Sequence, residues 1–262
     1  MGEKRGQVTI FVILGLAIVG LIFLASFLFL SDTPADEENP LSSQAPKTNS
    51  QNFIEECITP NLEDAIDKII LQGGYTYNKL PSLVYKFEDV SYLCYTSNYD
   101  ENCVNLEPMF TGAVESELES YLLANISSCF DKLLEVYSEY DSVIGSTELD
   151  VKILPQKINL DLQKSIDITE SGSQISFEDF SFNINSPLYT FLTMATEISN
   201  AETLCNCGEE SCNPDYFKID EFNRGFTTSR FTGSSGEKVY TIKYLRTGDE
   251  FNFAVRNCID NR

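Results

Sequence analysis

The stretch Thr147–Ser165, TELDVKILPQKINLDLQKS, decides the fold class, because its apolar and polar side chains alternate. The apolar positions in it are Leu149, Val151, Ile153, Ile158, Leu160 and Leu162. A period of two is typical of strands with one buried face. A third alternating run with Phe180, Phe182 and Ile184 comes after the turn residues Glu170–Ser173. The pattern predicts an antiparallel β-meander with one face in water.

Two helices are expected before the meander. The first begins at Thr59-Pro60, where the threonine can cap the helix and the proline suits its first turn, and it ends at Gly73-Gly74. The second, Thr111–Tyr140, has apolar side chains at steps of three or four, as an amphipathic helix does. These positions are Leu118, Leu122, Ile126, Cys129, Leu133 and Tyr137. We expect the two helices to pack against each other.

The remaining elements complete the prediction of an α+β fold. Two short strands, Ser82–Phe87 and Val90–Thr96, are expected between the two helices in the sequence. A third helix is expected over Pro187–Leu204, and two alternating runs near the C-terminus predict further strands. Their apolar positions are Tyr240, Ile242, Tyr244, Phe251, Phe253 and Val255. Helices segregated from antiparallel strands are typical of α+β domains, so we expect one such domain over residues 53–262, with a possible subdivision near Gly145.

The N-terminal segment predicts a membrane anchor. Val8–Leu30, VTIFVILGLAIVGLIFLASFLFL, carries no charge and no proline, and a helix of this length, about 34 Å, would cross the core of a bilayer. Lys4 and Arg5 precede it and acidic residues follow it, so the positive-inside rule keeps residues 1–7 in the cytoplasm. Residues 31–52 are rich in proline and small polar residues and predict a flexible, disordered stalk. We therefore expect a single-pass protein of the cell membrane with an extracellular C-terminal domain.

The residues just before the anchor are Lys4-Arg5-Gly6-Gln7. With the apolar helix that follows, they resemble the class III signal peptide of archaeal type IV pilins and related surface filaments. In that family a membrane peptidase cuts after the glycine, and the retained helix packs into a filament core. The resemblance implies cleavage between Gly6 and Gln7 by a prepilin-type peptidase, and self-assembly or association with other surface proteins. An ordinary uncleaved signal anchor in the lipid bilayer is the alternative interpretation.

The overall charge argues against nucleic acid as a partner. The chain has 40 acidic and 18 basic residues, for a net charge of −22, whereas proteins that bind nucleic acid present basic surfaces. A charge of this size keeps a protein soluble and raises the local concentration of cations. Solvated acidic faces, growth in high salt and loose calcium binding are all compatible with it.

The eight cysteines are an even number, which in an extracellular domain predicts disulfide bonds. The expected pairs are Cys57–Cys129, Cys94–Cys103, Cys207–Cys212 and Cys205–Cys258. The first would join the two long helices, and the second would close the loop over Ser97–Pro108. The last group is spaced C-x-C-x4-C and lacks the paired C-x-x-C of zinc and iron–sulfur sites, so disulfides are favoured over a metal. No cofactor is expected.

Little in the sequence predicts catalysis. Histidine is absent, which excludes Ser/His/Asp and Cys/His arrangements and histidine metal sites. Ser235–Lys238 matches S-x-x-K, but it lies in a glycine-rich turn, whereas the serine of such enzymes opens a buried helix. A carboxylate pair for glycoside hydrolysis stays open among so many acids. Asn125 begins the only glycosylation sequon, near the edge of the apolar stripe of its helix.

Four short stretches of the domain resemble uncharacterised surface proteins of small-genome archaea. They are Phe53–Cys57, Gln72–Tyr75, Glu117–Tyr121 and Phe253–Arg256. The resemblance implies a location at the cell surface and no particular activity. We therefore expect a structural or interaction role, as a pilin-like subunit, an adhesin or an envelope component. A tethered receptor for a ligand or a cation is the alternative. A histidine-free surface hydrolase is a third hypothesis, which a deep pocket with two facing carboxylates of raised pKa would favour.

Overall fold

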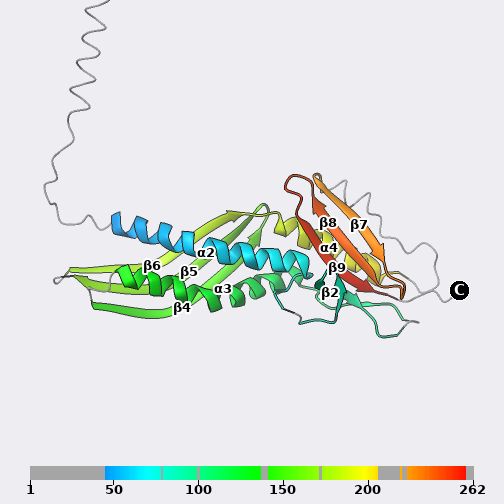
Figure 1. The fold of residues 1–262 in the computed structure, drawn as a ribbon, viewed down its shortest axis with the longest axis horizontal. Helices are drawn as coiled ribbons and strands as arrows, with labels where there is room; N and C mark the ends of the chain where they lie inside the picture. The colour runs from blue at the N-terminus through cyan, green and yellow to red at the C-terminus, as the bar shows by residue number, and fades with distance from the viewer. Residues whose placement is uncertain are drawn as a thin grey trace, which may run out of the picture. The chain divides into compact units, whose positions relative to one another are not determined.

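The computed structural model describes residues 45–77, 79–98, 101–136, 141–170, 173–205, 219 and 223–257. Residues Pro46–Arg262 form one compact unit, whose described part is the coloured ribbon in Figure 1. The predicted leader, the membrane helix and the stalk up to residue 44 lie outside the described residues. Among the residues that are described, no helix is both long and apolar enough to cross a bilayer.

The described residues contain three helices, α2 (Ala45–Leu71), α3 (Phe110–Val136) and α4 (Leu188–Thr203). The predicted packing of the first two is confirmed, because buried side chains of α2 and α3 belong to one core and a disulfide joins Cys57 to Cys129 (Figure 1). The predicted core positions of α3 that are described are all buried, namely Leu118, Leu122, Ile126, Cys129 and Leu133. The third helix also agrees with its prediction within two residues at its ends.

The start of α2 differs from the prediction. The helix begins at Ala45, inside the stretch expected to be a stalk, and Pro60 lies within it instead of opening it. A proline inside a helix removes one backbone hydrogen bond. Near this proline, Thr59 Oγ1 donates to the carbonyl of Glu55 at 2.8 Å. Apolar side chains before and after the proline are buried in the core, namely Ile54, Ile58, Leu62 and Ala65. Tertiary packing on both sides therefore carries the helix through Pro60.

The predicted meander is confirmed. Its strands β4 (Asp141–Leu154), β5 (Lys157–Glu170) and β6 (Ser173–Asn185) form a three-stranded antiparallel sheet in chain order. The alternating apolar side chains that are buried are Val151, Ile153, Ile158, Leu160, Leu162, Phe180 and Phe182. Gly145 lies inside β4 near a shift of the β4–β5 register. The strand continues through this glycine, so the structure does not divide the domain there.

Helix α3 protects the free edge of this sheet. β4 is an edge strand, and two of its outward backbone N–H groups point to carboxylates on successive turns of α3. Glu119 Oε1 accepts from the N–H of Val151 at 3.1 Å, and Glu115 Oε1 accepts from the N–H of Ile153 at 2.8 Å. Unpaired edge groups invite pairing with another chain, and these two carboxylates occupy them.

A second sheet is built from strands far apart in the sequence. Its strands are β1 (Ser82–Tyr85), β2 (Glu88–Tyr95), β3 (Val104–Asn105), β7 (Phe226–Thr232), β8 (Lys238–Tyr244) and β9 (Glu250–Arg256). The order is β1-β2-β9-β8-β7, with β3 also on β2. The strands expected near residues 82–96 and near the C-terminus are confirmed. Strand β7 and the parallel pairing of β2 with β9 were not predicted.

One hydrophobic core connects the two sheets through the helices. The ring of Phe130 on α3 meets Phe180 of the meander, with centroids 5.9 Å apart. At the other end of the core, Phe191 of α4 stacks on Phe251 of β9 at 5.9 Å. Helix α4 contacts both β8 and β9, and it starts directly after β6. Its first turn therefore lies where the meander meets the second sheet.

Candidate functional site

A polar pocket of about 910 Å³ opens beside the first turn of α4, between the end of the meander and the β7–β8 hairpin. The pocket is lined by Gln156, Asn185, Ser186, Pro187, Thr190, Asn223, Arg224, Phe226, Tyr244, Arg246 and Thr247. We call it the arginine pocket. The lining combines two guanidinium groups with carboxamides, hydroxyls and two aromatic rings, and this chemistry suits the binding of a polar ligand.

The pairing of β7 with β8 brings the two arginines together. Phe226, the first residue of β7, is opposite Tyr244, the last residue of β8. Arg224 comes two residues before β7, and Arg246 comes two residues after β8. The antiparallel register therefore places both arginines at the same end of the hairpin. An anion bound between the two guanidinium groups would interact favourably with both.

Two glycines shape the turns that carry these arginines. Gly225 has φ of 93°, and its carbonyl accepts from the N–H of Leu245 at 2.8 Å. Gly248 has φ of 91°, and its N–H donates to the carbonyl of Tyr244 at 2.8 Å. Glycine adopts this left-handed region without the steric cost that a side chain brings. The backbone on both sides of the pocket mouth is thus held by hydrogen bonds.

The opposite wall comes from the start of α4. The Ser186 side chain is buried, and its Oγ accepts from the N–H of Leu188 at 3.2 Å. The N–H of Ser186 donates to the carbonyl of Gln156 at 3.0 Å, which ties this wall to the tight turn between β4 and β5. Pro187 and Thr190 line the pocket from the first turn. The N-terminal end of a helix carries partial positive charge, which adds to the potential of the arginines.

Three cations lie in or beside the described lining of the pocket, and one carboxylate lies next to it, because Asp249 Oδ2 accepts from the hydroxyl of the lining residue Thr247 at 2.6 Å. Arg224 and Arg246 are exposed, and so is Lys157, which pairs in register with the lining residue Asn185. Within the described part of the chain, none of these three cations forms an ion pair, and the lining contains no carboxylate. By contrast, six lysines elsewhere pair with carboxylates, namely Lys68, Lys79, Lys86, Lys152, Lys238 and Lys243. The described lining of the pocket therefore carries positive charge, although the protein as a whole is acidic.

The aromatic wall of the pocket is continuous with the core. The rings of Phe226 and Tyr244 stack with centroids 4.7 Å apart. Behind them, Phe191 meets Phe226 edge-on at 5.3 Å and is itself buried. Because the packed core fixes these rings, the wall is formed in the absence of a ligand.

Two of the four predicted disulfides are formed. Cys57–Cys129 and Cys94–Cys103 have Cα–Cα distances of 5.8 and 5.4 Å. Cys205 is buried at the end of α4. The cysteines predicted to complete the other pairs, Cys207, Cys212 and Cys258, lie outside the described residues. The predicted cleavage site at Gly6 and Gln7 also lies outside them.

The predicted glycosylation site lies on α3, away from the arginine pocket. Asn125 is half-buried, and its Nδ2 donates to the carbonyl of Tyr121 at 2.8 Å. The nitrogen that would carry a glycan is therefore bound to the helix backbone, and glycosylation stays a prediction. The S-x-x-K match shows no catalytic geometry, because Lys238 Nζ binds both carboxylate oxygens of Glu202, at 2.8 and 2.7 Å.

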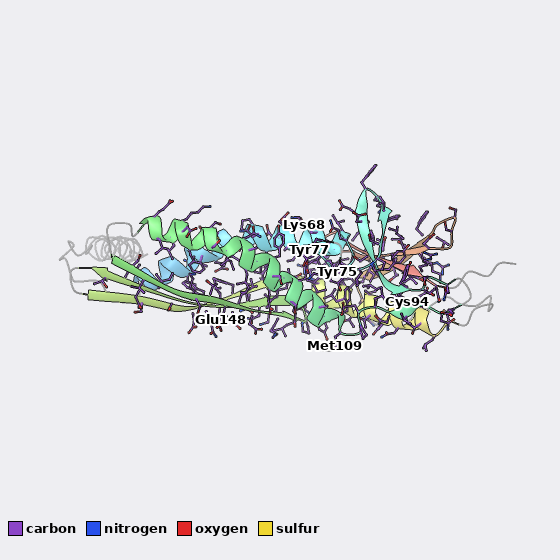
Figure 2. The ribbon with its side chains drawn as sticks, turned by 90° about the horizontal axis from the view of Figure 1, so that it is seen from below. Lys68, Tyr75, Tyr77, Cys94, Met109 and Glu148 are labelled. Atoms are coloured by element: carbon purple, nitrogen blue, oxygen red, sulfur yellow. A yellow bond between two sulfur atoms is a disulfide. The ribbon has the colours of Figure 1, made fainter. Side chains whose placement is uncertain are left out.

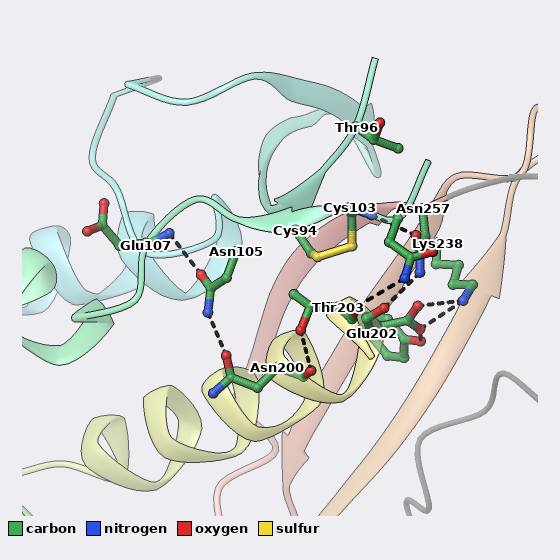
Figure 3. The surroundings of a disulfide bond; sticks show 12 residues. Cys94, Thr96, Cys103, Asn105, Glu107, Asn200, Glu202, Thr203, Lys238 and Asn257 are labelled. Atoms are coloured by element: carbon green, nitrogen blue, oxygen red, sulfur yellow. Dashed lines mark hydrogen bonds and ion pairs between the residues drawn. A yellow bond between two sulfur atoms is a disulfide. The ribbon is translucent and has the colours of Figure 1, made fainter. Parts of the chain in front are cut away.

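Glu202 instead belongs to a buried network beside a disulfide (Figure 3). Its carboxylate also accepts from the hydroxyl of Tyr240. Its backbone carbonyl accepts from Asn257 Nδ2 at 2.8 Å, and Asn257 Oδ1 accepts from the N–H of Cys103 at 2.8 Å. These bonds connect α4, β8 and the loop closed by the Cys94–Cys103 disulfide. We interpret the cluster as a structural clamp, since every group in it is engaged.

A second buried carboxylate, Glu117, fixes the segment after α2, which carries Tyr75 and Tyr77 (labelled in Figure 2). Glu117 on α3 accepts from the N–H of Thr76 at 3.0 Å and also binds the Thr76 hydroxyl and Lys79 Nζ. Next to it, the hydroxyl of Tyr75 donates to Glu107 Oε2 at 2.6 Å. Burial and the nearby carboxylates raise the pKa of Tyr75, so its hydroxyl stays protonated. This cluster also stabilises the fold.

The geometry lends no support to the hydrolase hypothesis in the described residues. They contain no group of three or more His, Cys, Asp or Glu side chains that could hold a metal ion. Hydrogen bonds from lysines hold the pKa values of Asp64 and Glu250 below the usual range of a carboxyl. A carboxyl that acts as a general acid needs a raised pKa instead.

Sequence reasoning missed the arginine pocket. A weak signal was present, since Arg224-Gly225 and Arg246-Thr247-Gly248 both place an arginine near a glycine turn. Only the register of the unpredicted strand β7 shows that the two arginines share one end of a hairpin. A comparison of the chain with known protein families, with curated proteins and with solved structures found no match.

Proposed function

We propose that this chain is a membrane-anchored protein of the cell surface whose extracellular domain binds an anionic ligand in the arginine pocket. In this role it would act as an adhesin or as an envelope receptor. The observation that carries the proposal is the pair Arg224 and Arg246, which line a pocket whose described lining contains no carboxylate, on a chain of net charge −22.

A contribution to fold stability does not explain why these two arginines lie in the pocket. Arginine forms two parallel hydrogen bonds with a carboxylate or a phosphate, so it readily satisfies an acidic neighbour where one exists. Acidic residues outnumber basic ones by more than two to one in the chain. Even so, Arg224 and Arg246 lie beside the positive end of α4, and the lining residues that the structure describes include no carboxylate. An anionic ligand would supply the missing partner.

The surface location is supported by separate features. The apolar segment Val8–Leu30 and the charges on its two sides favour an anchor with the N-terminus inside. The two disulfides are typical of proteins that fold outside the cytosol. A domain on the outer side of a membrane would meet extracellular ligands first, so the location and the binding role fit each other.

The binding role can be tested with a simple anion. The full-length protein, purified in detergent, would be titrated with citrate in low salt, and R224A/R246A would be compared with K132A. Lys132 is an exposed cation of α3 outside the pocket lining, so K132A changes the net charge without touching the site. We expect the arginine variant to lose affinity by about 10-fold or more, as for the loss of hydrogen bonds to a charged group. Equal affinities of the two variants would contradict the proposal.

The anchor can be tested by mass analysis of the N-terminus of protein purified from native membranes. A chain that starts at Gln7 would indicate cleavage by a prepilin-type peptidase and would favour a filament subunit that carries the binding domain. A chain that starts at Met1 or Gly2 would indicate an uncleaved anchor and a tethered receptor. A chain that starts after Leu30 would contradict the anchored role altogether.

A further inference from the structure

The arginine pocket is large for a single inorganic anion. Its volume of about 910 Å³ lies within the range of about 300–1,000 Å³ that is typical of sites for small organic ligands. The lining reaches from Gln156 in the β4–β5 turn to Thr247 in the β8–β9 loop. A ligand that fills it must therefore carry other groups besides its negative charge.

Several neutral side chains of the lining have donor or acceptor groups that no described residue uses. Within the described residues, the side chains of Gln156, Asn185 and Thr190 have no hydrogen-bond partner. Asn223 uses its Nδ2 on the carbonyl of Ile219, at 2.9 Å, which leaves its Oδ1 as an acceptor. A carboxamide both donates and accepts, as a hydroxyl group does. This set matches a ligand with several hydroxyl groups.

The aromatic pair and the arginines complete the match. Phe226 and Tyr244 are half-buried and stacked, so they present a rigid apolar surface beside the polar groups. The faces of sugar rings carry C–H groups that pack on such a surface. Both cations of the lining are guanidinium groups, whose planar donors fit the two oxygens of a carboxylate.

We propose, on the basis of the proposed function, that the ligand is an acidic saccharide, a short oligosaccharide with uronic-acid carboxylates. Arg224 and Arg246 bind its carboxylates. Gln156 and Asn185 exchange hydrogen bonds with its hydroxyl groups, and Tyr244 with its stacked neighbour supports a ring face. Neither a simple anion nor a neutral sugar uses all three parts of the pocket.

The test is a set of titration calorimetry measurements on the full-length protein with three probes. The first is trigalacturonate, the second is its methyl ester, which keeps the rings and hydroxyls but removes the charge, and the third is ATP as a different organic anion. The proteins are the wild type, R224A/R246A, Q156A/N185A and the K132A control. Thermal unfolding of each variant would verify its fold, and because the changed side chains are exposed we expect unfolding temperatures close to the wild type.

We expect the wild type to bind trigalacturonate at least about 10-fold more tightly than the ester or ATP. Both double variants should weaken this binding, by about 10-fold or more for the arginines and several-fold for the carboxamides, while K132A should not. Tight binding of ATP that depends on the arginines, without binding of trigalacturonate, would overturn the saccharide but leave the proposed function intact. Equal binding of the ester and the acid would overturn the role of the arginines. The absence of binding to all three probes and to citrate would overturn both proposals.

Discussion

Removal of the Cys57–Cys129 disulfide should destabilise the protein more than removal of the Cys94–Cys103 disulfide. The two bonds differ in the length of chain that they close, since the cysteines are 72 residues apart in the first pair and 9 in the second. A disulfide stabilises mainly by restricting the unfolded chain, and this effect grows with the logarithm of the loop length.

The magnitudes follow from these separations. The loop-entropy relation gives about 4.4 kcal/mol for a 72-residue loop and about 2.6 kcal/mol for a 9-residue loop at 25 °C. Three of the four cysteines are fully or almost fully buried, and Cys57 packs against the same core. Replacement by alanine therefore removes a similar amount of apolar contact in both pairs. This loss largely cancels when the unfolding free energies of the two variants are compared. We expect C57A/C129A to be about 2 kcal/mol less stable than C94A/C103A.

The assay is urea-induced unfolding of the purified protein, followed by circular dichroism, for the wild type and both double alanine variants. Each variant lacks two cysteines and keeps the other disulfide together with the last four cysteines of the chain, so the comparison is matched. A larger loss in C94A/C103A would refute the reasoning. It would show that the Cys94–Cys103 disulfide stabilises the protein mainly in the folded state, where it holds Cys103 for its hydrogen bond to Asn257. This effect would then exceed the restriction that either disulfide places on the unfolded chain.

Two further predictions concern packing and charge. Gly74 has φ of 102°, and an added Cβ would come within 2.5 Å of the Phe110 ring, so G74A should cost about 2–4 kcal/mol of unfolding free energy. G112A, where an added Cβ meets nothing within 4 Å inside α3, should stabilise by about 0.5–1 kcal/mol. Similar urea midpoints for the two variants would contradict this contrast. Hydrogen bonds from Lys243 and Lys86 lower the pKa of Glu250 in the folded protein. The ionised carboxylate therefore stabilises the fold at a pH above its unfolded pKa, and this stabilisation is lost as the pH falls through its folded pKa. E250Q should therefore be less stable than the wild type at pH 7, by up to about 1 kcal/mol, and this difference should disappear as the pH falls through the folded pKa of Glu250. A difference that persists in acid would show that it is not ionic.

The meander and the long helices could be predicted because their signals are local. Val151 and Leu160 alternate with polar neighbours along one strand each, and that pattern depends only on which face is buried. The start of α2 could not be predicted from local signals, because proline is a good first residue of a helix and the neighbours of Pro60 fit that position. Burial of side chains on both sides of it, among them Ile54 and Leu62, outweighs the backbone bond that the proline removes.

The second sheet and its pocket could not be predicted from local patterns in the sequence. Tyr92 of β2 pairs in parallel with Ala254 of β9, and a pairing between residues so distant leaves no periodic trace in either segment. Arg224 and Arg246 line one pocket only because β7 and β8 pair in one particular register. An arginine beside a glycine turn is ordinary in a soluble protein. It becomes a candidate site only when the fold places a second arginine at the same end of a hairpin beside a pocket.

The edges of the meander bear on how such a protein could assemble. A strand edge with free backbone groups recruits strands from other chains. Here Glu115 and Glu119 occupy N–H groups of β4 on one edge, and Gln51 Nε2 of α2 donates to the carbonyl of Ser181 on the other, at 3.3 Å. Helix α3 thus protects part of the β4 edge while it also carries the core, and α2 contacts the β6 edge at one point. Strand exchange through this sheet would have to break these bonds and expose two carboxylates to an incoming backbone. Capture of a separate ligand at the arginine pocket would leave these bonds intact, because none of the residues that form them is in the described lining of the pocket.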